Sequence, residues 1–461
     1  MNCIKHSKNN AIIILFLLMV FTACKTTELS TSEPSKKKLA DLFSSSEVFS
    51  GNFTGFALYN AQTESMLYAK NEKRYFTPAS NTKLFTFYAG LKLLPDSVAA
   101  LKYIERGDSL IFWGTGDPSF LQGDFSDTTA YNFLKNSSTK LYYSDSHYQD
   151  KGLGPGWAWS DFQNAYSAEK SPFPMYGNTV NFKVREVTIN TIQADNKGQL
   201  DISPSFFETY VKEVTSTEKA DEQPILSREF SENMFQYAPR IKTTITTVEK
   251  PFHYTPQLIV EMLSDTLGKP VQYIDRELPD SVETLYSVPA DTVYKYMLQR
   301  SDNFMAEQLL LVAASEQGKP LKSNNAIFEM KKRYLLSMPD APKWVDGSGL
   351  SRYNLFTPRS IIWLLKKIDD EFKSDKELFD MLPAGGERGT IKNLFASRDG
   401  GPPYVFAKTG TLSNNYCLSG YIITQSGRKL LFSFMNNNYV TSSTVVKEEM
   451  EKILWYIHEN Y

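Results

Sequence analysis

The sequence predicts an α/β fold of the α+β kind, in which one antiparallel sheet is built from both chain ends and flanked by helices. Near the N-terminus, residues 53–61 and 66–70 are rich in apolar and aromatic residues and flank a polar turn, which is typical of two adjacent strands. Near the C-terminus, strand-like runs at 404–407, 416–424 and 429–435 precede a closing amphipathic helix. Strands at both ends favour a single sheet, with the remaining chain inserted between them.

The middle of the chain, residues 101–285, has a different pattern. It contains short strand-like pieces such as Leu110–Trp113 and Thr179–Val184, separated by turns. We expect one or two inserted β-rich domains there, while residues 39–100 and 286–461 form the main domain. Further helical patterns lie at about 80–94, 292–314 and 358–368.

The first residues have the pattern of an export signal. Two lysines precede an apolar run at 11–20, which is shorter than the roughly 18 residues needed to cross a bilayer. The small residues before Cys24 resemble a bacterial lipobox, so we expect 1–23 to be removed and Cys24 to be lipidated. An ordinary signal peptide with an incidental cysteine is the alternative. Residues 24–38 are expected to be a flexible tether.

The composition is that of a large globular protein. Hydrophobic residues make up 41% and aromatic residues 13% of the chain, with a formal net charge of -2. This near-neutral charge gives no support for nucleic-acid binding. Besides Cys3 and Cys24 the only cysteine is Cys417, so the exported protein has no disulfide within its domains and must be stabilised by its core.

A serine followed three residues later by a lysine on a helix can perform acyl transfer without histidine. The two side chains share one helix face, and a partly desolvated lysine can take the hydroxyl proton. The bare spacing is weak evidence, because it occurs at Ser35, Ser80, Ser137, Ser167, Ser216 and Ser426. Ser80 differs from the others because it precedes an apolar helix that would bury Lys83. Ser80 and Lys83 are therefore the strongest candidate pair, although any one of these pairs alone also fits a solvated surface pair.

Two polar motifs further along the chain fit the same chemistry. The Ser-Asp-Asn triplet at 301–303 is expected to interrupt or link two buried helices, although alone it also fits a helix cap. The Lys-Thr-Gly-Thr motif at 408–411 follows a strand-like run, and alone it also fits an exposed hairpin end. Its glycine would let a substrate backbone approach the strand edge, and its lysine and threonines can hold a carboxylate.

The three motifs, in this order, resemble the active-site set of penicillin-binding proteins and serine β-lactamases. The chain is most similar to peptidase family S13, the D-alanyl-D-alanine carboxypeptidase/endopeptidases or class C low-molecular-mass penicillin-binding proteins. Pro78–Leu84 and Asp346–Arg352 look like its signatures, and Gly116–Ser119 and Gly154–Trp159 resemble its inserted domains. One departure is Glu-Arg at 387–388, where the family more often has Asp-Gly. The resemblance implies a β-lactamase/transpeptidase-like catalytic domain with inserts between the first and second motifs.

The resemblance also implies catalytic roles. Ser80 would attack the carbonyl between two D-alanines of a peptidoglycan stem peptide and form an acyl-enzyme, with Lys83 as the base. Ser301 and Lys408 would relay a proton to the leaving D-alanine, and Asn303 would hold the peptide amide.

The same resemblance implies the residues that bind substrate. The backbone amides of Ser80 and Thr411 would form an oxyanion hole, which contributes roughly 3 kcal/mol per donor in comparable sites. Thr409, Gly410 and Thr411 would bind the substrate beside Lys408. β-Lactam antibiotics would act as covalent inhibitors, and the lipid anchor would hold the enzyme on a membrane.

Two other functions stay open at this stage. A β-lactamase-like hydrolase uses the same motifs but needs fast deacylation, and the long insertion argues against it. A non-catalytic wall-binding lipoprotein could retain the fold without the activity. The chain has no His-Glu-x-x-His, phosphate-binding or dinucleotide-binding motif, so we expect neither a metal nor another cofactor.

Overall fold

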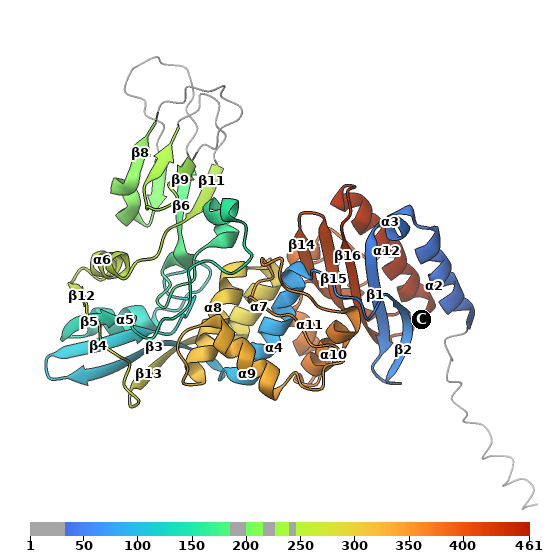
Figure 1. Ribbon diagram of the computed structural model, residues 1–461, viewed down its shortest axis with the longest axis horizontal. Coiled ribbons are helices and arrows are strands. Elements are labelled where there is room, and N and C mark those ends of the chain that lie inside the picture. Colours follow the sequence, from blue (N-terminus) through green and yellow to red (C-terminus); the bar gives the residue numbers. More distant parts are fainter. Residues whose placement is uncertain (1–32, 185–199, 215–225, 239–245) are drawn as a thin grey trace, which may run out of the picture.

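The chain forms an elongated molecule in which a five-stranded sheet, a helical body and a β-rich insertion follow one another (Figure 1). The structure, a computed structural model, describes residues 33–184, 200–214, 226–238 and 246–461. The predicted signal peptide, residues 1–23, and the predicted lipidation site, Cys24, lie outside the described residues. In the described part of the chain, no helix is long and apolar enough to span a membrane.

The main sheet is built from both ends of the chain, as the sequence predicted. Its strands lie in the order β14-β15-β16-β1-β2, and all neighbours are antiparallel. Phe56 and Leu58 pack on one face, and Ala57 between them packs on the other, because helices cover both faces. The strands are β1 Phe53–Asn60, β2 Ser65–Lys70, β14 Val405–Leu412, β15 Asn415–Ile423 and β16 Lys429–Asn437.

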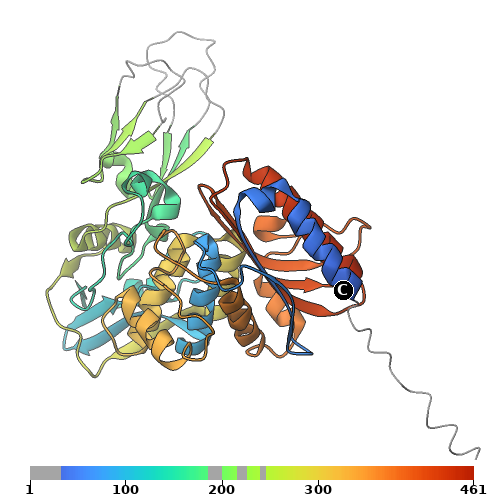
Figure 2. The same ribbon diagram turned by 45° about the vertical axis from the view of Figure 1, so that its right-hand side comes forward.

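Three helices cover the outer face of this sheet: α2 Glu33–Ser45, α3 Glu47–Gly51 and α12 Ser443–Asn460 (Figure 2). Leu39 and Phe43 of α2 are fully buried in the outer core. The expectation that residues 24–38 form a flexible tether is therefore wrong for 33–38, which begin a packed helix. The helix was not predicted because its apolar residues start only at Leu39 and the preceding residues are mostly Ser and Lys, which are typical of a tether.

The helical body lies against the inner face of the sheet. α4 and α8 run through its centre, and residues 304–315 of α8 are all buried, which explains why their sequences are apolar on every side. The body contains α4 Lys83–Leu93, α7 Ala290–Arg300, α8 Asn303–Glu316, α9 Ser323–Arg333, α10 Pro358–Asp369 and α11 Asp375–Met381.

The insertion is centred on a second five-stranded sheet, in the order β12-β5-β4-β3-β13. The expected boundaries, 101 and 285, fall inside its strands β3 and β13. These two strands pair with each other, so the insertion begins and ends outside them. Its elements are β3 Ser97–Arg106, β4 Ser109–Gly114, α5 Thr129–Asn136, β5 Lys140–Ser144, α6 Pro256–Leu267, β12 Val271–Tyr273 and β13 Glu283–Pro289.

Two small sheets project from the insertion in Figure 1. One has the order β11-β6-β7 and the other the order β8-β10-β9. The expected strand at 179–184 is confirmed as β6. The strands are β6 Thr179–Val184, β7 Leu200–Ser203, β8 Val211–Glu213, β9 Leu226–Arg228, β10 Phe235–Tyr237 and β11 Thr246–Pro251.

The docking of α2 can be tested at Phe43, whose ring contacts those of Phe49, Phe56 and Phe434. Phe43→Ala is expected to lower the free energy of unfolding by about 3–5 kcal/mol, because a large buried ring is lost. Lys37→Ala, on the exposed side of the same helix, should change it by less than about 0.5 kcal/mol. Denaturant unfolding of both variants measures this. Equal free energies of unfolding for the two variants would show that α2 does not pack on the sheet.

Candidate active site

Ser80 and Lys83 lie where the sheet meets the helical body. Ala79–Thr82 forms a single 3₁₀ turn, η1, and α4 begins at Lys83, so the expected helix starts three residues later than Ser80. Lys83 is fully buried. Its Nζ lies 3.0 Å from Ser80 Oγ, so the serine and lysine that the sequence paired are in hydrogen-bond contact.

The Lys83 amine has three oxygen neighbours. Besides Ser80 Oγ, it donates to Asn303 Oδ1 at 2.6 Å and to the Ser348 carbonyl at 2.8 Å. A neutral amine has two N–H donors and one lone pair. Because the two carbonyl oxygens can only accept, they take both N–H groups and leave the lone pair facing the Ser80 hydroxyl. The geometry therefore suits proton removal from Ser80.

Burial favours this neutral form. Desolvation lowers the pKa of Lys83 to about 8, although the nearby carboxylates of Asp302, Asp346 and Glu307 act in the opposite direction. Roughly a tenth of Lys83 is therefore unprotonated at pH 7, compared with less than about a thousandth of an exposed lysine. A base needs a pKa in this range to work at physiological pH.

The triplet 301–303 links two buried helices, as expected. Ser301 ends α7 in the left-handed conformation, and Asp302 caps α8 by accepting a hydrogen bond from Met305 N at 2.8 Å. The cap interpretation was thus also correct for Asp302. Asn303 Oδ1 faces Lys83, and its Nδ2 donates to the Tyr166 carbonyl at 2.9 Å. A segment of the insertion therefore helps to orient Asn303.

Lys408 approaches the site from the opposite side. Its buried Nζ donates to Ser301 Oγ at 2.7 Å and to the Thr409 carbonyl at 2.8 Å. Desolvation and the charge of Lys83 hold the pKa of Lys408 well below its usual value. Strand β14 continues through residues 408–411, so the motif is part of a strand. Lys408, Thr409 and Gly410 are buried, and only Thr411 is exposed near the turn to β15, so the hairpin-end interpretation fits Thr411 alone.

Gly410 is needed for a different reason from the one expected. A Cβ there would lie 2.4 Å from the Pro78 carbonyl oxygen and 3.0 Å from Asn81 N, so the glycine lets η1 pack against β14. Gly410 does not line the cavity described below. Asn81, which sequence reasoning missed, reinforces the contact by donating from Nδ2 to the Lys408 carbonyl at 3.1 Å.

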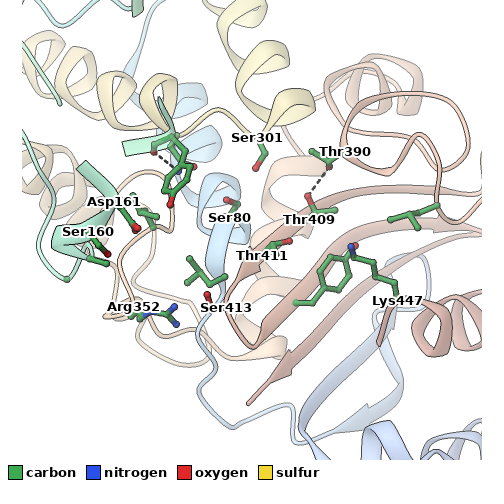
Figure 3. A pocket seen from close by; sticks show the side chains of 18 residues that line it. Ser80, Ser160, Asp161, Ser301, Arg352, Thr390, Thr409, Thr411, Ser413 and Lys447 are labelled. Atoms are coloured by element: carbon green, nitrogen blue, oxygen red, sulfur yellow. Dashed lines mark hydrogen bonds between the residues drawn. The ribbon is translucent and has the colours of Figure 1, made fainter. Parts of the chain in front are cut away.

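A cavity of about 750 Å³ opens in front of these groups. Figure 3 shows the hydroxyls of Ser80, Ser301, Thr409 and Thr411 around its centre. Lys83 and Lys408 lie behind this wall, out of contact with solvent. The cavity is also lined by charged and polar residues that sequence reasoning did not assign: Ser160, Asp161, Arg352, Thr390, Ser413 and Lys447. Thr390 accepts a hydrogen bond from Thr409 Oγ1 at 2.9 Å.

The loop 346–352 supplies the third neighbour of Lys83, the Ser348 carbonyl. Gly349 has φ +85°, and a Cβ there would lie 1.9 Å from the Ala79 carbonyl oxygen. The loop is thus pressed against η1. Trp157 of the insertion donates to Asp346 Oδ2 at 2.9 Å, which joins the insertion to the same loop. The family-like segment at 346–352 was the signal for this loop, although the role of the Ser348 carbonyl was not visible in it.

Residues 35–459 match the model of the D-Ala-D-Ala carboxypeptidase 3 (S13) family. The chain belongs to this family. The predicted family and enzyme class, a serine-type D-Ala-D-Ala carboxypeptidase, are thereby confirmed.

Similar proteins agree with this membership. The chain is 24% identical over 456 residues to the D-alanyl-D-alanine carboxypeptidase DacB of Haemophilus influenzae, with 89% of this chain and 91% of the relative covered. It is 24% identical over 426 residues to the D-alanyl-D-alanine carboxypeptidase of Actinomadura sp. strain R39, with 84% and 78% covered.

A solved structure confirms the predicted fold class. The crystal structure of penicillin binding protein 4 (dacB) from Haemophilus influenzae matches with a TM-score of 0.73 at 20% identity, covering 91% of this chain and 99% of that chain. A second structure of that protein, complexed with a novel β-lactam, has a TM-score of 0.67 at 19% identity, with 92% and 99% covered.

The contact between Gly349 and η1 can be tested by adding one methyl group. Gly349→Ala should displace Ala79 and Ser80, and we expect penicillin acylation to fall more than roughly tenfold, because small displacements of reacting groups cost large rate factors. Gly427→Ala is the matched control, since Gly427 also has a positive φ (+80°) but open space around it. Stopped-flow acylation and thermal unfolding measure both variants. Equal acylation rates in the two variants would contradict the tight contact.

Proposed function

We propose that the protein is a penicillin-binding D-Ala-D-Ala carboxypeptidase that cleaves peptidoglycan stem peptides through an acyl-enzyme at Ser80. Family membership supports the reaction class. The observation that carries the assignment to Ser80 is its contact with the buried Lys83 amine, whose two N–H groups are occupied by carbonyl oxygens.

Acylation begins when Lys83 takes the Ser80 proton and Ser80 Oγ attacks the carbonyl carbon between the two D-alanines. The negative charge that develops on the carbonyl oxygen is stabilised by the backbone amides of Ser80 and Thr411, which serve as the oxyanion hole. Asn303 is placed to hold the substrate amide, because the cavity exposes it while Lys83 and Tyr166 fix its side chain.

The C–N bond then breaks, and the leaving D-alanine nitrogen needs a proton. Ser301 is placed to deliver it, since its hydroxyl lines the cavity and accepts a hydrogen bond from Lys408. The terminal carboxylate of the substrate binds the hydroxyls of Thr409 and Thr411 beside Lys408. This anion favours the protonated form of Lys408, which lets the Ser301–Lys408 pair act as a proton relay. Water finally hydrolyses the ester at Ser80.

Exported location and membrane attachment are also part of the proposal. The apolar run at 11–20 and the small residues before Cys24 support export and lipidation at that cysteine. Residues 25–32 separate Cys24 from Glu33, the first residue of the packed helix α2, so the connection is short. We therefore infer that the catalytic domain is held close to the membrane surface.

The nucleophile is tested with fluorescent penicillin and with a pentapeptide ending in D-Ala-D-Ala. Ser80→Ala should lose covalent labelling and D-alanine release, because the hydroxyl beside the Lys83 amine is removed. Ser137→Ala is the matched control, since Ser137 also precedes a lysine by three residues but lies outside the cavity, and it should behave like wild type.

Three results would contradict the proposal. Labelling of Ser80→Ala at the wild-type level would place the nucleophile elsewhere. Rapid, repeated penicillin hydrolysis would favour a β-lactamase-like enzyme. Absence of both labelling and D-alanine release from wild type would favour a non-catalytic wall-binding protein.

A further inference from the structure

A buried carboxyl group lies behind Lys83 and has no part in the proposed reaction. Glu307 is on α8, one turn after Asn303, and its side chain is 1% exposed. It does not line the cavity, so it cannot contact substrate. A buried carboxyl group destabilises the fold unless its environment compensates for the loss of water. Glu307 therefore needs an explanation.

Glu307 contacts the residue that holds Lys83. Its Oε1 accepts a hydrogen bond from Ser348 N at 2.8 Å, and the Ser348 carbonyl in turn accepts one from Lys83 Nζ at 2.8 Å. The main-chain N–H and C=O groups of Ser348 thus connect the Glu307 carboxyl group to the Lys83 amine. Among the described residues, no hydrogen-bond donor reaches the buried Oε2 of Glu307. Ser348 N therefore satisfies one oxygen, and the main-chain N–H of Gly347 also lowers the pKa of the carboxyl group.

Three charged groups interact with this carboxyl group. Asp346 lies in the adjoining loop, Lys170 lies in the insertion, and Lys83 begins α4. Burial first, and then the charge of Asp346, raise the pKa of Glu307 to about 7, while Lys170 acts in the opposite direction. Lys83 in turn is influenced by Asp302, Asp346 and Glu307, and it lowers the pKa of Lys408. Burial thus raises the pKa of Glu307 and lowers that of Lys83, which brings the two titrations into the same pH range.

We propose that Glu307 is a positioning residue that fixes the Ser348 carbonyl against Lys83 and adds its negative charge to that of Asp302 and Asp346 around the Lys83 amine. The hydrogen bond to Ser348 N holds the loop in place. The negative charge of Glu307 stabilises the ammonium form of Lys83. At a given pH, fewer enzyme molecules therefore have the neutral amine that acts as a base. This role rests on the proposed acylation of Ser80 with Lys83 as base.

The charge is tested with Glu307→Gln, which has nearly the same shape and keeps an oxygen acceptor for Ser348 N. The rate of penicillin acylation is measured from about pH 5 to about pH 10, a range that covers the titration of Lys83. In wild type the rate should rise with pH as Lys83 loses its proton. Without the carboxylate the ammonium form is less stable, so the rise should move to lower pH by roughly half a unit or more. The rate at the high-pH plateau should stay within about threefold of wild type.

The hydrogen bond is tested separately with Glu307→Asp. This variant keeps the charge but withdraws the oxygen from Ser348 N, so the plateau rate should fall more than roughly tenfold while the rise stays nearer its wild-type pH. Glu316→Gln is the matched control, because it removes a carboxylate from the same helix near Lys102 and away from the cavity. Its pH profile should match that of wild type. Circular dichroism and thermal unfolding confirm that each variant is folded.

The outcomes separate this inference from the function on which it rests. If wild type shows no penicillin acylation, the proposed function fails. If wild type is acylated but Glu307→Gln leaves the pH of the rise unchanged, Glu307 has only a structural role and the inference is wrong. A shift equally large in Glu316→Gln would also contradict it, since the effect would then not depend on the contact with Ser348. If neither Glu307 variant folds, an NMR titration of ¹³C-lysine-labelled wild type tests the charge instead. The Lys83 ε-carbon must then report a second ionisation below its own midpoint, and a single titration step would contradict the inference.

Discussion

The burial of one amine between two carbonyl oxygens and a hydroxyl is the interaction on which the rest of this structure depends. Lys83 would be protonated and strongly hydrated at the surface, and it would then be a poor base. Inside the protein it loses its water, and Asn303 and Ser348 occupy both of its N–H groups. The remaining lone pair of the Lys83 nitrogen is directed at the Ser80 hydroxyl. The chemistry therefore arises from desolvation together with acceptor placement, without a histidine.

The fold brings distant segments together to build this environment. Ser80 and Lys83 come from the N-terminal part of the chain, Asn303 follows the insertion, and Lys408 lies on a strand from the C-terminal part. Because the sheet is made from both ends of the chain, β14 lies beside η1, and Gly410 permits their close approach. The insertion also reaches the site, through the Tyr166 carbonyl that orients Asn303. Catalytic groups are thus held by rigid elements, with the insertion forming one wall of the cavity.

The polar motifs could be found in the sequence because each breaks a local pattern. Residues 301–303 lie between two helices with buried residues, and Lys83 is a charge at the start of an apolar helix, so both are unusual without a function. Glu307 was not predicted because an isolated carboxyl group in an apolar stretch of α8 is typical of a solvated position, and only the structure shows that residues 304–315 are all buried. The Ser348 carbonyl is a main-chain group and carries no side-chain signal. Helix α2 was missed because its packing depends on contacts with α12 and the sheet, which are distant in sequence.

The state of the Lys83 amine is the most direct test of this mechanism. In protein labelled with ¹³C-lysine, an NMR titration of the ε-carbon, assigned by comparison with a Lys83→Arg variant, gives the pKa of Lys83 in the free enzyme. A midpoint near pH 8 is predicted, because desolvation outweighs the neighbouring carboxylates. A midpoint of about 10.4, as for an exposed lysine, would mean that Lys83 stays protonated at neutral pH and cannot be the base.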